Sequence, residues 1–348
     1  MDCTEGERRE MNRERLLLVA LLCVLAIACE WMACKYMPSQ TVIPNRSQPA
    51  TTSEVILNGE IDQPYPADNW WNLDVSNAPV DSNSDAFISW IGESRTLHPD
   101  WGMYYGIPMV TVGTATPCIP IDIYGYPGES DPREYYPGPF PYPIPGIATY
   151  DWRYVEQGSD HHLIMYNVYT GYLYELFGAE WTGTEWRAKS GAIFDTKVNY
   201  RRPEGWTSAD AAGLEIMPGL VKYHEVDGDK EIEHAFRFTL RATNGYVWPA
   251  SHSAGSVQGS LPMGARLRLR ANFDVSGYAD PVQRFLRALK TRGLILADNG
   301  SDMYIQGTQD ARWGDMSMWV DALNDVTASD FEVIELGWKP EIGTGIPE

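Results

Sequence analysis

Polar and apolar residues alternate with a period of two along several stretches of this chain, and this alternation limits the possible fold most strongly. Between positions 231 and 240, most of the apolar side chains fall at every second position. These positions are Ile232, His234, Phe236, Phe238 and Leu240. The segment 266–273 repeats the pattern, with arginine at alternate positions. Because successive side chains point to opposite faces of a β-strand, both segments are predicted to be strands.

Other stretches favour the same class of structure. The segments 163–166 and 172–177 flank Asn167–Gly171, which is typical of a hairpin connection. Thirteen Trp and twenty Tyr, with Gly and Pro dispersed throughout, favour short strands joined by turns. Two short helices are expected, one from Asp280 to Gly293 with Pro281 in its first turn, and a shorter one at 208–212. The prediction is a mostly β, sandwich-like or jelly-roll-like single domain with long loops.

The N-terminal segment has the form of an export signal. Basic residues precede an apolar run of thirteen residues, Leu16–Ala28, so residues 1–28 are predicted to be a signal peptide. Cleavage after Ala28 would leave Cys29 first, either lipidated or simply the start of a secreted protein. Residues 29–54 are expected to form a disordered tether, and residues 55–340 one β-rich domain. The protein is therefore expected to be extracellular or anchored at the cell surface.

The charge of the chain excludes one class of partner. A formal net charge of −20 opposes non-specific binding to nucleic acid, whose phosphates require the opposite sign. Contact with a membrane is expected only through an N-terminal lipid. Cys34 and Cys118 are either a disulfide pair or two free thiols.

Two carboxylates are the first candidates for catalysis. Glu175 shares a strand face with apolar neighbours, an environment that raises the pKa of a carboxyl group and suits it to act as a general acid. Asp195 follows a similar apolar strand, and glycoside hydrolysis needs two carboxyl groups across the scissile bond. The alternative is that both carboxylates form ion pairs with an arginine stripe made of Arg237, Arg266, Arg268 and Arg270.

A second candidate lies at the entrance of the strand that begins at Leu163. Asp160 could orient His162 as a base, although Asp and His at a strand entrance often cap backbone groups instead. Further along, Asp298–Asp302 is interpreted as a turn, with a structural calcium ion as the alternative. No other cofactor is expected.

Aromatic residues in predicted turns indicate a carbohydrate partner, because flat rings stack on the apolar faces of sugars. Trp206 and Trp248 are the candidates of this kind. The arginines either bind the carboxylates of a uronic-acid polymer or pair with internal carboxylates. His234 is either a core histidine or part of a groove. The expected substrate-binding residues are Arg237, Trp206, Trp248, His252 and His234.

Three runs carry a resemblance to other proteins. Gly205–Leu214, Ser190–Asp195 and the segment 288–300 resemble parts of a group of secreted bacterial proteins of unassigned activity, and the likeness covers most of residues 68–335. The resemblance implies a single exported β-rich domain and assigns no catalytic residue.

These patterns lead to one functional hypothesis and two alternatives. The first is an extracellular glycoside hydrolase acting on a polysaccharide or surface glycan, with Glu175 and Asp195 as the carboxylate pair and Asp160 and His162 in support. The second is a non-catalytic carbohydrate-binding or cell-surface structural protein. The third is a polysaccharide lyase, with His162 or His234 as the base.

Overall fold

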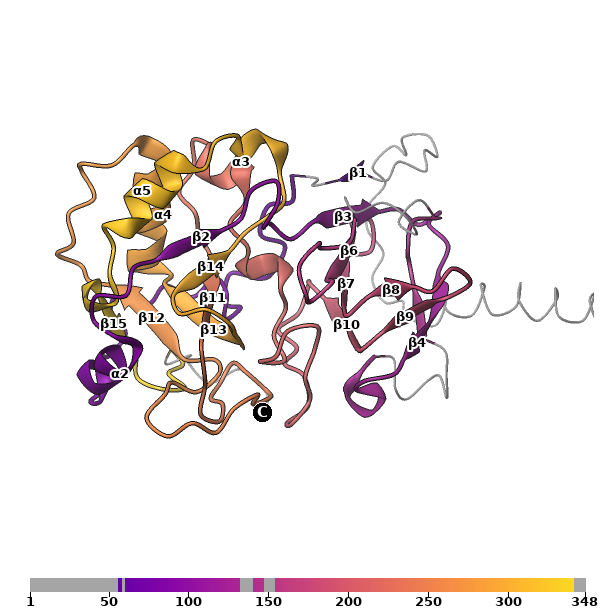
Figure 1. The fold of residues 1–348 in the computed structure, drawn as a ribbon, viewed down its shortest axis with the longest axis horizontal. Helices are drawn as coiled ribbons and strands as arrows, with labels where there is room; N and C mark the ends of the chain where they lie inside the picture. The colour runs from indigo at the N-terminus through magenta and orange to yellow at the C-terminus, as the bar shows by residue number, and fades with distance from the viewer. Residues whose placement is uncertain (1–55, 58–59, 132–139, 147–153, 341–348) are drawn as a thin grey trace, which may run out of the picture.

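The computed structural model describes residues 56–57, 60–131, 140–146 and 154–340. Two halves lie side by side, one built from a sheet with helices and the other from two sheets (Figure 1). The predicted signal peptide, the predicted tether and Cys34 lie outside the described residues. Within the described ranges, no helix has the length and hydropathy needed to cross a bilayer.

The first sheet belongs to the half without helices. Its strands, in spatial order, are β1 (Ile56–Leu57), β3 (Met109–Val112), β6 (Leu163–Asn167), β7 (Tyr172–Phe177) and β10 (Ser190–Asp195). Strands β3 and β6 are parallel, and the other neighbours are antiparallel. The predicted hairpin is confirmed as β6 and β7, and the Asn167 side chain accepts bonds from the backbone N–H groups of Tyr169 and Thr170 at 3.1 Å each.

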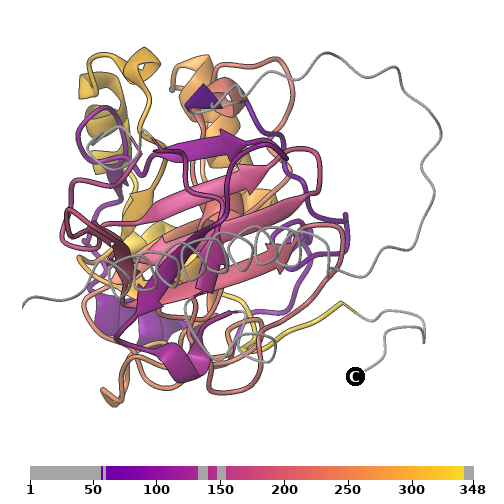
Figure 2. The ribbon, with the colours of Figure 1, turned by 90° about the vertical axis from the view of Figure 1, so that its right-hand side faces the viewer.

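The third sheet covers one face of the first. Its strands, in spatial order, are β5 (Phe140–Tyr142), β4 (Ile119–Ile123), β9 (Trp186–Ala188) and β8 (Glu180–Trp181). Figure 2 looks onto this pair of sheets. Their facing side chains form one hydrophobic cluster, which includes Val110, Leu163 and Leu176 from the first sheet and Ile121 and Trp186 from the third. The burial of these side chains holds the two sheets together.

The second sheet forms the other half of the molecule. Its strands, in spatial order, are β15 (Phe331–Val333), β12 (Arg266–Leu269), β13 (Leu294–Asn299), β11 (Phe236–Leu240), β14 (Tyr304–Gln306) and β2 (His98–Asp100). Strands β11 and β13 are parallel, as are β14 and β2. Every residue of β11 is buried, because this central strand is covered on both faces.

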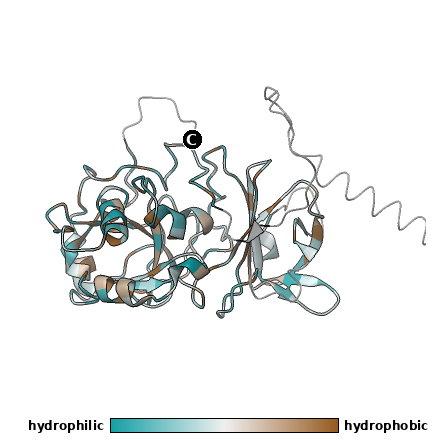
Figure 3. Ribbon diagram, turned by 90° about the horizontal axis from the view of Figure 1, so that it is seen from above, coloured by the Kyte–Doolittle hydropathy of each residue, from teal (hydrophilic) through white to brown (hydrophobic). Residues whose placement is uncertain are grey.

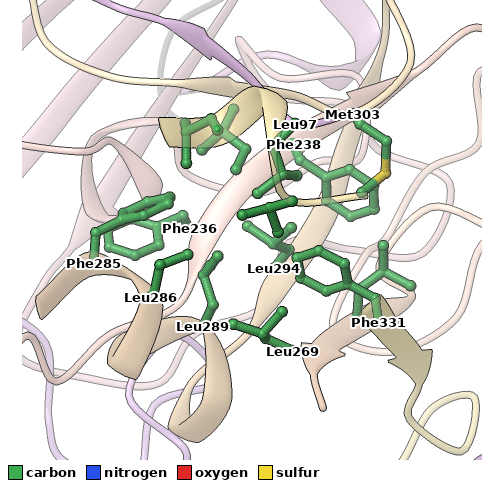
Figure 4. Packing of buried hydrophobic residues seen from close by; sticks show 14 of the residues in the cluster. Leu97, Phe236, Phe238, Leu269, Phe285, Leu286, Leu289, Leu294, Met303 and Phe331 are labelled. Atoms are coloured by element: carbon green, nitrogen blue, oxygen red, sulfur yellow. The ribbon is translucent and has the colours of Figure 1, made fainter. Parts of the chain in front are cut away.

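Helices pack against this sheet in the largest hydrophobic cluster. They are α2 (Ser84–Ile91), α3 (Tyr223–Val226), α4 (Asp280–Thr291) and α5 (Ser317–Asn324), and each contributes side chains to the cluster. Helix α4 confirms the predicted helix, with Asp280 and Pro281 in its first turn. Figure 4 shows Phe285 and Leu289 of α4 beside Phe236 and Leu294 of the sheet. Each helix carries both hydrophilic and hydrophobic residues, as expected for one that buries a single face (Figure 3).

The helix expected at 208–212 was wrong. This segment forms successive turns instead, in which the hydroxyl of Ser208 accepts the backbone N–H of Asp210 at 2.8 Å. A serine side chain that bonds the backbone in this way competes with helical hydrogen bonds. Four single-turn 3-10 helices complete the described elements: η1 (Pro127–Glu129), η3 (Met217–Gly219), η4 (Ala311–Trp313) and η5 (Ala328–Asp330).

The mostly β prediction is confirmed in its coarse form. The described residues form three mixed sheets with a few short helices and no closed barrel. Jelly rolls are built from antiparallel strands, whereas four strand pairs here are parallel: β3 with β6, β4 with β9, β11 with β13 and β14 with β2. The parallel pairs therefore depart from a simple jelly-roll arrangement.

Candidate functional site

One face of the second sheet carries a concentration of polar side chains. The strand register puts Tyr304 opposite both His98 and Thr239, and Gln306 opposite Asp100. Since residues two apart on a strand share a face, one side of the sheet presents what we call the polar face: His98, Asp100, Arg237, Thr239, Asp298, Tyr304 and Gln306. Five of these residues are half-buried, and Arg237 and Thr239 are buried.

A β-bulge brings Asp298 to this face. Leu294 and Leu296 pair with Phe236 and Phe238, so regular alternation would send Asp298 into the hydrophobic cluster as well. The register shifts between Phe238 and Thr239, and Asp298 instead pairs with Thr239. Bulges often redirect a side chain beside a functional site.

Arg237 forms a fully buried ion pair on the polar face. Its Nη2 donates to Oδ1 of Asp210 at 2.8 Å, and neither side chain is exposed to solvent. Nε and Nη1 of Arg237 and Oδ2 of Asp210 have no hydrogen-bond partner among the described residues. Asp210 comes from the turn segment that crosses between the two halves, where Ala212 N donates to Ala297 O at 2.9 Å. Buried polar atoms without protein partners are expected at sites that bind a ligand or water.

The segment before β6 approaches the same place from the other half. Oε2 of Glu156 accepts the backbone N–H of His162 at 3.1 Å and lies 3.9 Å from Nε2 of the His162 ring. Nδ1 of the buried His162 has no hydrogen-bond partner in the described part of the chain. Asp160 accepts a bond from the Ser159 hydroxyl at 3.3 Å, and its charge acts on Glu156 and on His162. The carboxylate beside His162 is therefore Glu156, rather than the expected Asp160.

The charges of these groups act on one another strongly. Burial raises the pKa of Glu156 to about 7, with Asp160 adding to the rise. Burial and the charge of Glu156 raise the pKa of Asp100 to about 6. Burial raises the pKa of Asp210 to about 7 despite its ion pair with Arg237. We call this group the acidic centre: Asp100, Glu156, Asp160, Asp210 and Asp298 around Arg237 and His162.

His162 is held in its neutral form. Burial, reinforced by the positive charge of Arg237, lowers the pKa of His162 to about 4. Burial also raises the pKa of Asp298, although Arg237 and His162 oppose this effect. A neutral imidazole can donate a hydrogen bond at one ring nitrogen and accept one at the other. The groups suited to proton transfer near neutral pH are therefore the carboxyl groups of Glu156 and Asp100.

Glu175 lies at the edge of this network in a structural position. Its Oε1 accepts the backbone N–H of Met217 and its Oε2 that of Ile216, both at 2.9 Å. The side chain has no exposed surface, and burial raises its pKa to about 8. The predicted apolar environment is confirmed, but the carboxyl group anchors the start of η3 and does not face solvent.

Asp195 and Glu175 do not form the expected facing pair. Glu175 pairs with Ala192 and Asp195 with Tyr172, and these positions differ by an odd number of residues along β10. The two carboxyl groups therefore point to opposite faces of the first sheet. Asp195 instead accepts the backbone N–H of Lys197 at 3.0 Å.

The predicted substrate-binding residues separate into different places. His234 is buried, with Nε2 at 2.9 Å from Glu225 and Nδ1 at 2.9 Å from the Ala235 carbonyl, as the core interpretation predicts. Trp248 is half-buried and packs edge-on against Trp70.

The other two candidates lie against the turn segment of Asp210. Nδ1 of His252 is 2.8 Å from the Ala211 carbonyl. Trp206 stacks against the guanidinium of Arg202, 5.5 Å from the ring centroid. These four side chains therefore have separate partners, and of the predicted binding residues Arg237 belongs to the acidic centre.

The arginine stripe pairs with internal groups. Arg268 bonds Glu332 at 2.5 Å, Arg270 approaches the same carboxylate at 3.5 Å, and Arg266 donates to the backbone carbonyl of Trp70. With Arg237 bound to Asp210, this arrangement agrees with the internal-partner alternative.

Within the described ranges, no three His, Cys, Asp or Glu side chains are placed to bind a metal ion together. In the segment considered for calcium, Asp298 faces Arg237, and Asp302 accepts a bond from Arg241 at 2.6 Å. The two carboxylates therefore point to different partners.

Sequence patterns missed Asp100, Glu156 and Asp210. Asp100 lies in β2, a strand too short to give a clear alternating pattern. Asp210 lies in the segment 208–212, which was predicted to be a helix. Glu156 is six residues from His162, and a turn brings the two together. Searches of protein-family models, curated proteins and solved structures gave no match to this chain.

Proposed function

We propose that this chain is an exported enzyme that hydrolyses glycosidic bonds in a polysaccharide, and that the acidic centre is its active site. The proposal is supported by the electrostatic interaction between carboxyl groups that come from both halves of the molecule. Asp100 ends β2 in the second sheet, Glu156 precedes β6 in the first, and the charge of Glu156 raises the pKa of Asp100. The catalytic unit would thus lie between the two halves, with the first and third sheets as a sandwich-like support.

Glu156 is the proton donor in this proposal. A pKa of about 7 keeps a large fraction of its carboxyl group protonated at neutral pH, as protonation of a leaving sugar oxygen requires. Asp100, with a pKa of about 6, is mostly ionised at the same pH and supplies the second carboxylate. The buried side chains of His162 and Arg237 position and polarise these two carboxyl groups.

Two aromatic side chains near Asp100 suit a sugar. The rings of His98 and Tyr304 stack at 4.1 Å between centroids on the polar face, two positions along their strands from Asp100 and Gln306. Both rings are half-buried and can offer a flat edge or face to a pyranose.

The polysaccharide-lyase alternative loses its main support. A lyase of the expected kind would bind a uronate carboxylate through Arg237, but this side chain has no exposed surface and is already paired with Asp210. The binding-protein alternative is favoured by Tyr104 and Tyr105, which are 82% and 74% exposed and closely follow Asp100 in the chain. An activity assay separates binding from hydrolysis.

The test is a reducing-end assay on a panel of polysaccharides with the wild-type chain and with Glu156→Gln and Asp100→Asn. Each substitution should lower the rate about 100-fold or more, since general acid catalysis contributes 10² to 10⁴. Glu185→Gln, in the exposed turn between β8 and β9, is the matched control and should keep the wild-type rate. Cleavage that persists in both active-site variants would reject the assignment, and binding without cleavage by the wild type would favour the binding protein.

A further inference from the structure

Strand β10 is the last strand of the first sheet, and among the described residues no strand pairs with it on the side away from β7. The N–H groups of Gly191 and Ile193 and the carbonyl of Gly191 point to this outer side, where they bond residues that are not part of the sheet. Unpaired groups of this kind form a template on which a strand of another chain can add. The residues that occupy this edge therefore decide whether β10 can accept another strand.

The segment 125–131, which follows β4 and contains η1, bonds this edge group by group. The Ser130 hydroxyl accepts the N–H of Gly191 at 3.1 Å, and the N–H of Asp131 donates to the Gly191 carbonyl at 3.1 Å. One residue further along the segment's path, Oδ2 of Asp131 accepts the N–H of Ile193 at 3.2 Å. Side chains and backbone of the segment thus take the bonds that a neighbouring strand would make.

Two further contacts fix the ends of this segment. The N–H groups of Gly125 and Tyr126 both donate to the carbonyl of Lys189, at 3.1 and 2.7 Å. At the other end, the hydroxyl of Tyr142 donates to the carbonyl of Asp131 at 2.9 Å. The segment is therefore attached both to the start of β10 and to the third sheet.

A buried guanidinium holds Asp131 in place. Arg202 is only 3% exposed, and its Nη1 donates to Oδ2 of Asp131, the atom that also accepts the Ile193 N–H. Nη2 of Arg202 donates to the carbonyl of Glu129 at 2.5 Å, and Nε donates to the carbonyl of Thr207 at 2.6 Å. Because these bonds are charge-assisted and shielded from water, they fix the carboxylate of Asp131 against β10.

From these contacts we infer that the segment 125–131 is an edge cap, a device built into the fold that prevents β10 from adding a strand of a second copy of this chain. Asp131 is its central residue, since its N–H and its carboxylate take two of the bonding positions that an added strand would use. A charged side chain at a sheet edge also opposes pairing with another strand. The inference does not depend on the proposed function.

The partner expected at an uncapped edge is a second copy. Two identical edges related by a two-fold axis can pair antiparallel, so that each bonds the same groups of the other. Removal of the cap should therefore convert a chain that does not associate through β10 into one that forms dimers there.

The experiment is sedimentation velocity of the full-length chain over a wide range of concentration. The wild type should keep one mass throughout, whereas Asp131→Ala should show a mass that doubles as the concentration rises. Asp122→Ala, at an exposed carboxylate of β4, is the matched control and should behave as the wild type.

Two double variants make the test specific. Asp131→Ala leaves the buried Arg202 without its carboxylate, so Asp131→Ala/Arg202→Met removes both charges and should also double in mass without that penalty. Asp131→Ala/Ile193→Pro should return to the wild-type mass. Proline has no N–H for an added strand, and the N–H of Ile193 points away from β7, so the ladder within the sheet is kept.

Three results would overturn the inference. The first is a wild-type mass at all concentrations in folded Asp131→Ala and in Asp131→Ala/Arg202→Met, with folding checked by far-UV circular dichroism. The second is self-association that persists after Ile193→Pro. The third comes from hydrogen exchange of the wild type, where the amides of Gly191 and Ile193 should be protected, and exchange as fast as in an unstructured peptide would show that the segment does not cap the edge.

Discussion

Asp298 shares a face of the second sheet with Arg237 because one extra residue in β13 reverses the side of the sheet to which the Asp298 side chain points. Arg237 pairs with Ile295 and Thr239 with Asp298, so the intervening bulge contains Ala297. Without that residue, Asp298 would follow Leu294 and Leu296 into the hydrophobic cluster. A single local irregularity thus places a carboxylate on the same face as the buried guanidinium of Arg237.

The first prediction concerns the buried ion pair of Arg237 and Asp210. Arg237→Met should lower the free energy of unfolding by about 3–5 kcal/mol, because it leaves a buried carboxylate without its partner. The double variant Arg237→Met/Asp210→Leu should recover much of that loss. Urea denaturation followed by tryptophan fluorescence measures both.

Arg187→Met is the control for this prediction. Arg187 also binds a carboxylate, Glu180, at 2.8 Å, but both side chains are more than 40% exposed. Its removal should therefore leave the free energy of unfolding almost unchanged. Equal losses for Arg187→Met and Arg237→Met would show that burial does not determine how much an ion pair contributes to the free energy of unfolding.

The second prediction is a fall in stability as the pH rises from about 5 to 8. In the unfolded chain, Glu175 ionises near its ordinary pKa of 4.5, whereas in the folded chain its pKa is about 8 because of burial. Between these values the folded protein holds a proton that the unfolded chain has lost, so a higher pH favours unfolding. Glu175→Gln should remove a few kcal/mol of this dependence, at about 1.4 kcal/mol per pKa unit.

Thermal unfolding across that pH range measures the effect. The substitution keeps an acceptor oxygen for the N–H groups of Ile216 and Met217, so it should fold. A residual slope from Glu156, Asp210 and Asp100 is expected, since burial raises their pKa values too. A variant with the full wild-type slope would contradict the role of Glu175.

The elements that followed from sequence are those with a regular period. Alternation predicted strands at 231–240 and 266–273, within which the shorter strands β11 and β12 lie, and Asp280 followed by Pro281 predicted the start of α4. The short helices α2 and α5, of eight residues each, went unnoticed because two turns give little periodic signal. The parallel strand pairs could not be predicted, since pairing depends on contacts between distant segments.

The candidate site was predictable only in part. Asp160, His162 and Arg237 were selected from sequence and do belong to the acidic centre. Asp298 was interpreted as part of a turn, because a bulge does not appear in a periodic pattern. The predicted pairing of Glu175 with Asp195 was wrong. In the register of β7 and β10 the two positions differ by an odd number of residues, so their side chains lie on opposite faces of the sheet.

The third prediction is the pH profile of catalysis. Asp100 must be ionised and Glu156 protonated, so kcat/KM should follow a bell whose limbs lie near pH 6 and pH 7. Because the two groups interact, the limbs belong to the pair rather than to either residue. Asp195→Asn should leave both limbs and the rate unchanged. Glu175 borders the acidic centre, and Asp195 lies on the opposite face of the first sheet from Glu175. A profile that is flat between pH 5 and 8 would exclude this carboxyl pair as the catalytic groups.

The last prediction concerns acid stability and the buried cluster of Lys222, Glu225 and His234. Glu225 accepts bonds from Lys222 and His234 at 2.9 Å each. Although burial opposes ionisation, these two positive partners lower its pKa to about 2. The ring of His234 faces an oxygen at each nitrogen, the carboxylate of Glu225 at Nε2 and the carbonyl of Ala235 at Nδ1.

The sign of this effect is opposite to that of Glu175. Glu225 remains ionised in the folded protein at pH values where the unfolded chain, with a pKa near 4.5, has taken up a proton. Its contribution to stability is therefore complete above about pH 4.5 and is lost as the pH falls toward 2. Glu225→Gln should lower stability at pH 7 by about 3 kcal/mol and flatten this acid limb, as measured by urea denaturation from pH 2.5 to 7. Glu335→Gln, at an exposed carboxylate, should leave the acid limb as it is, and an unchanged limb in Glu225→Gln would mean that the cluster does not hold Glu225 in its ionised form.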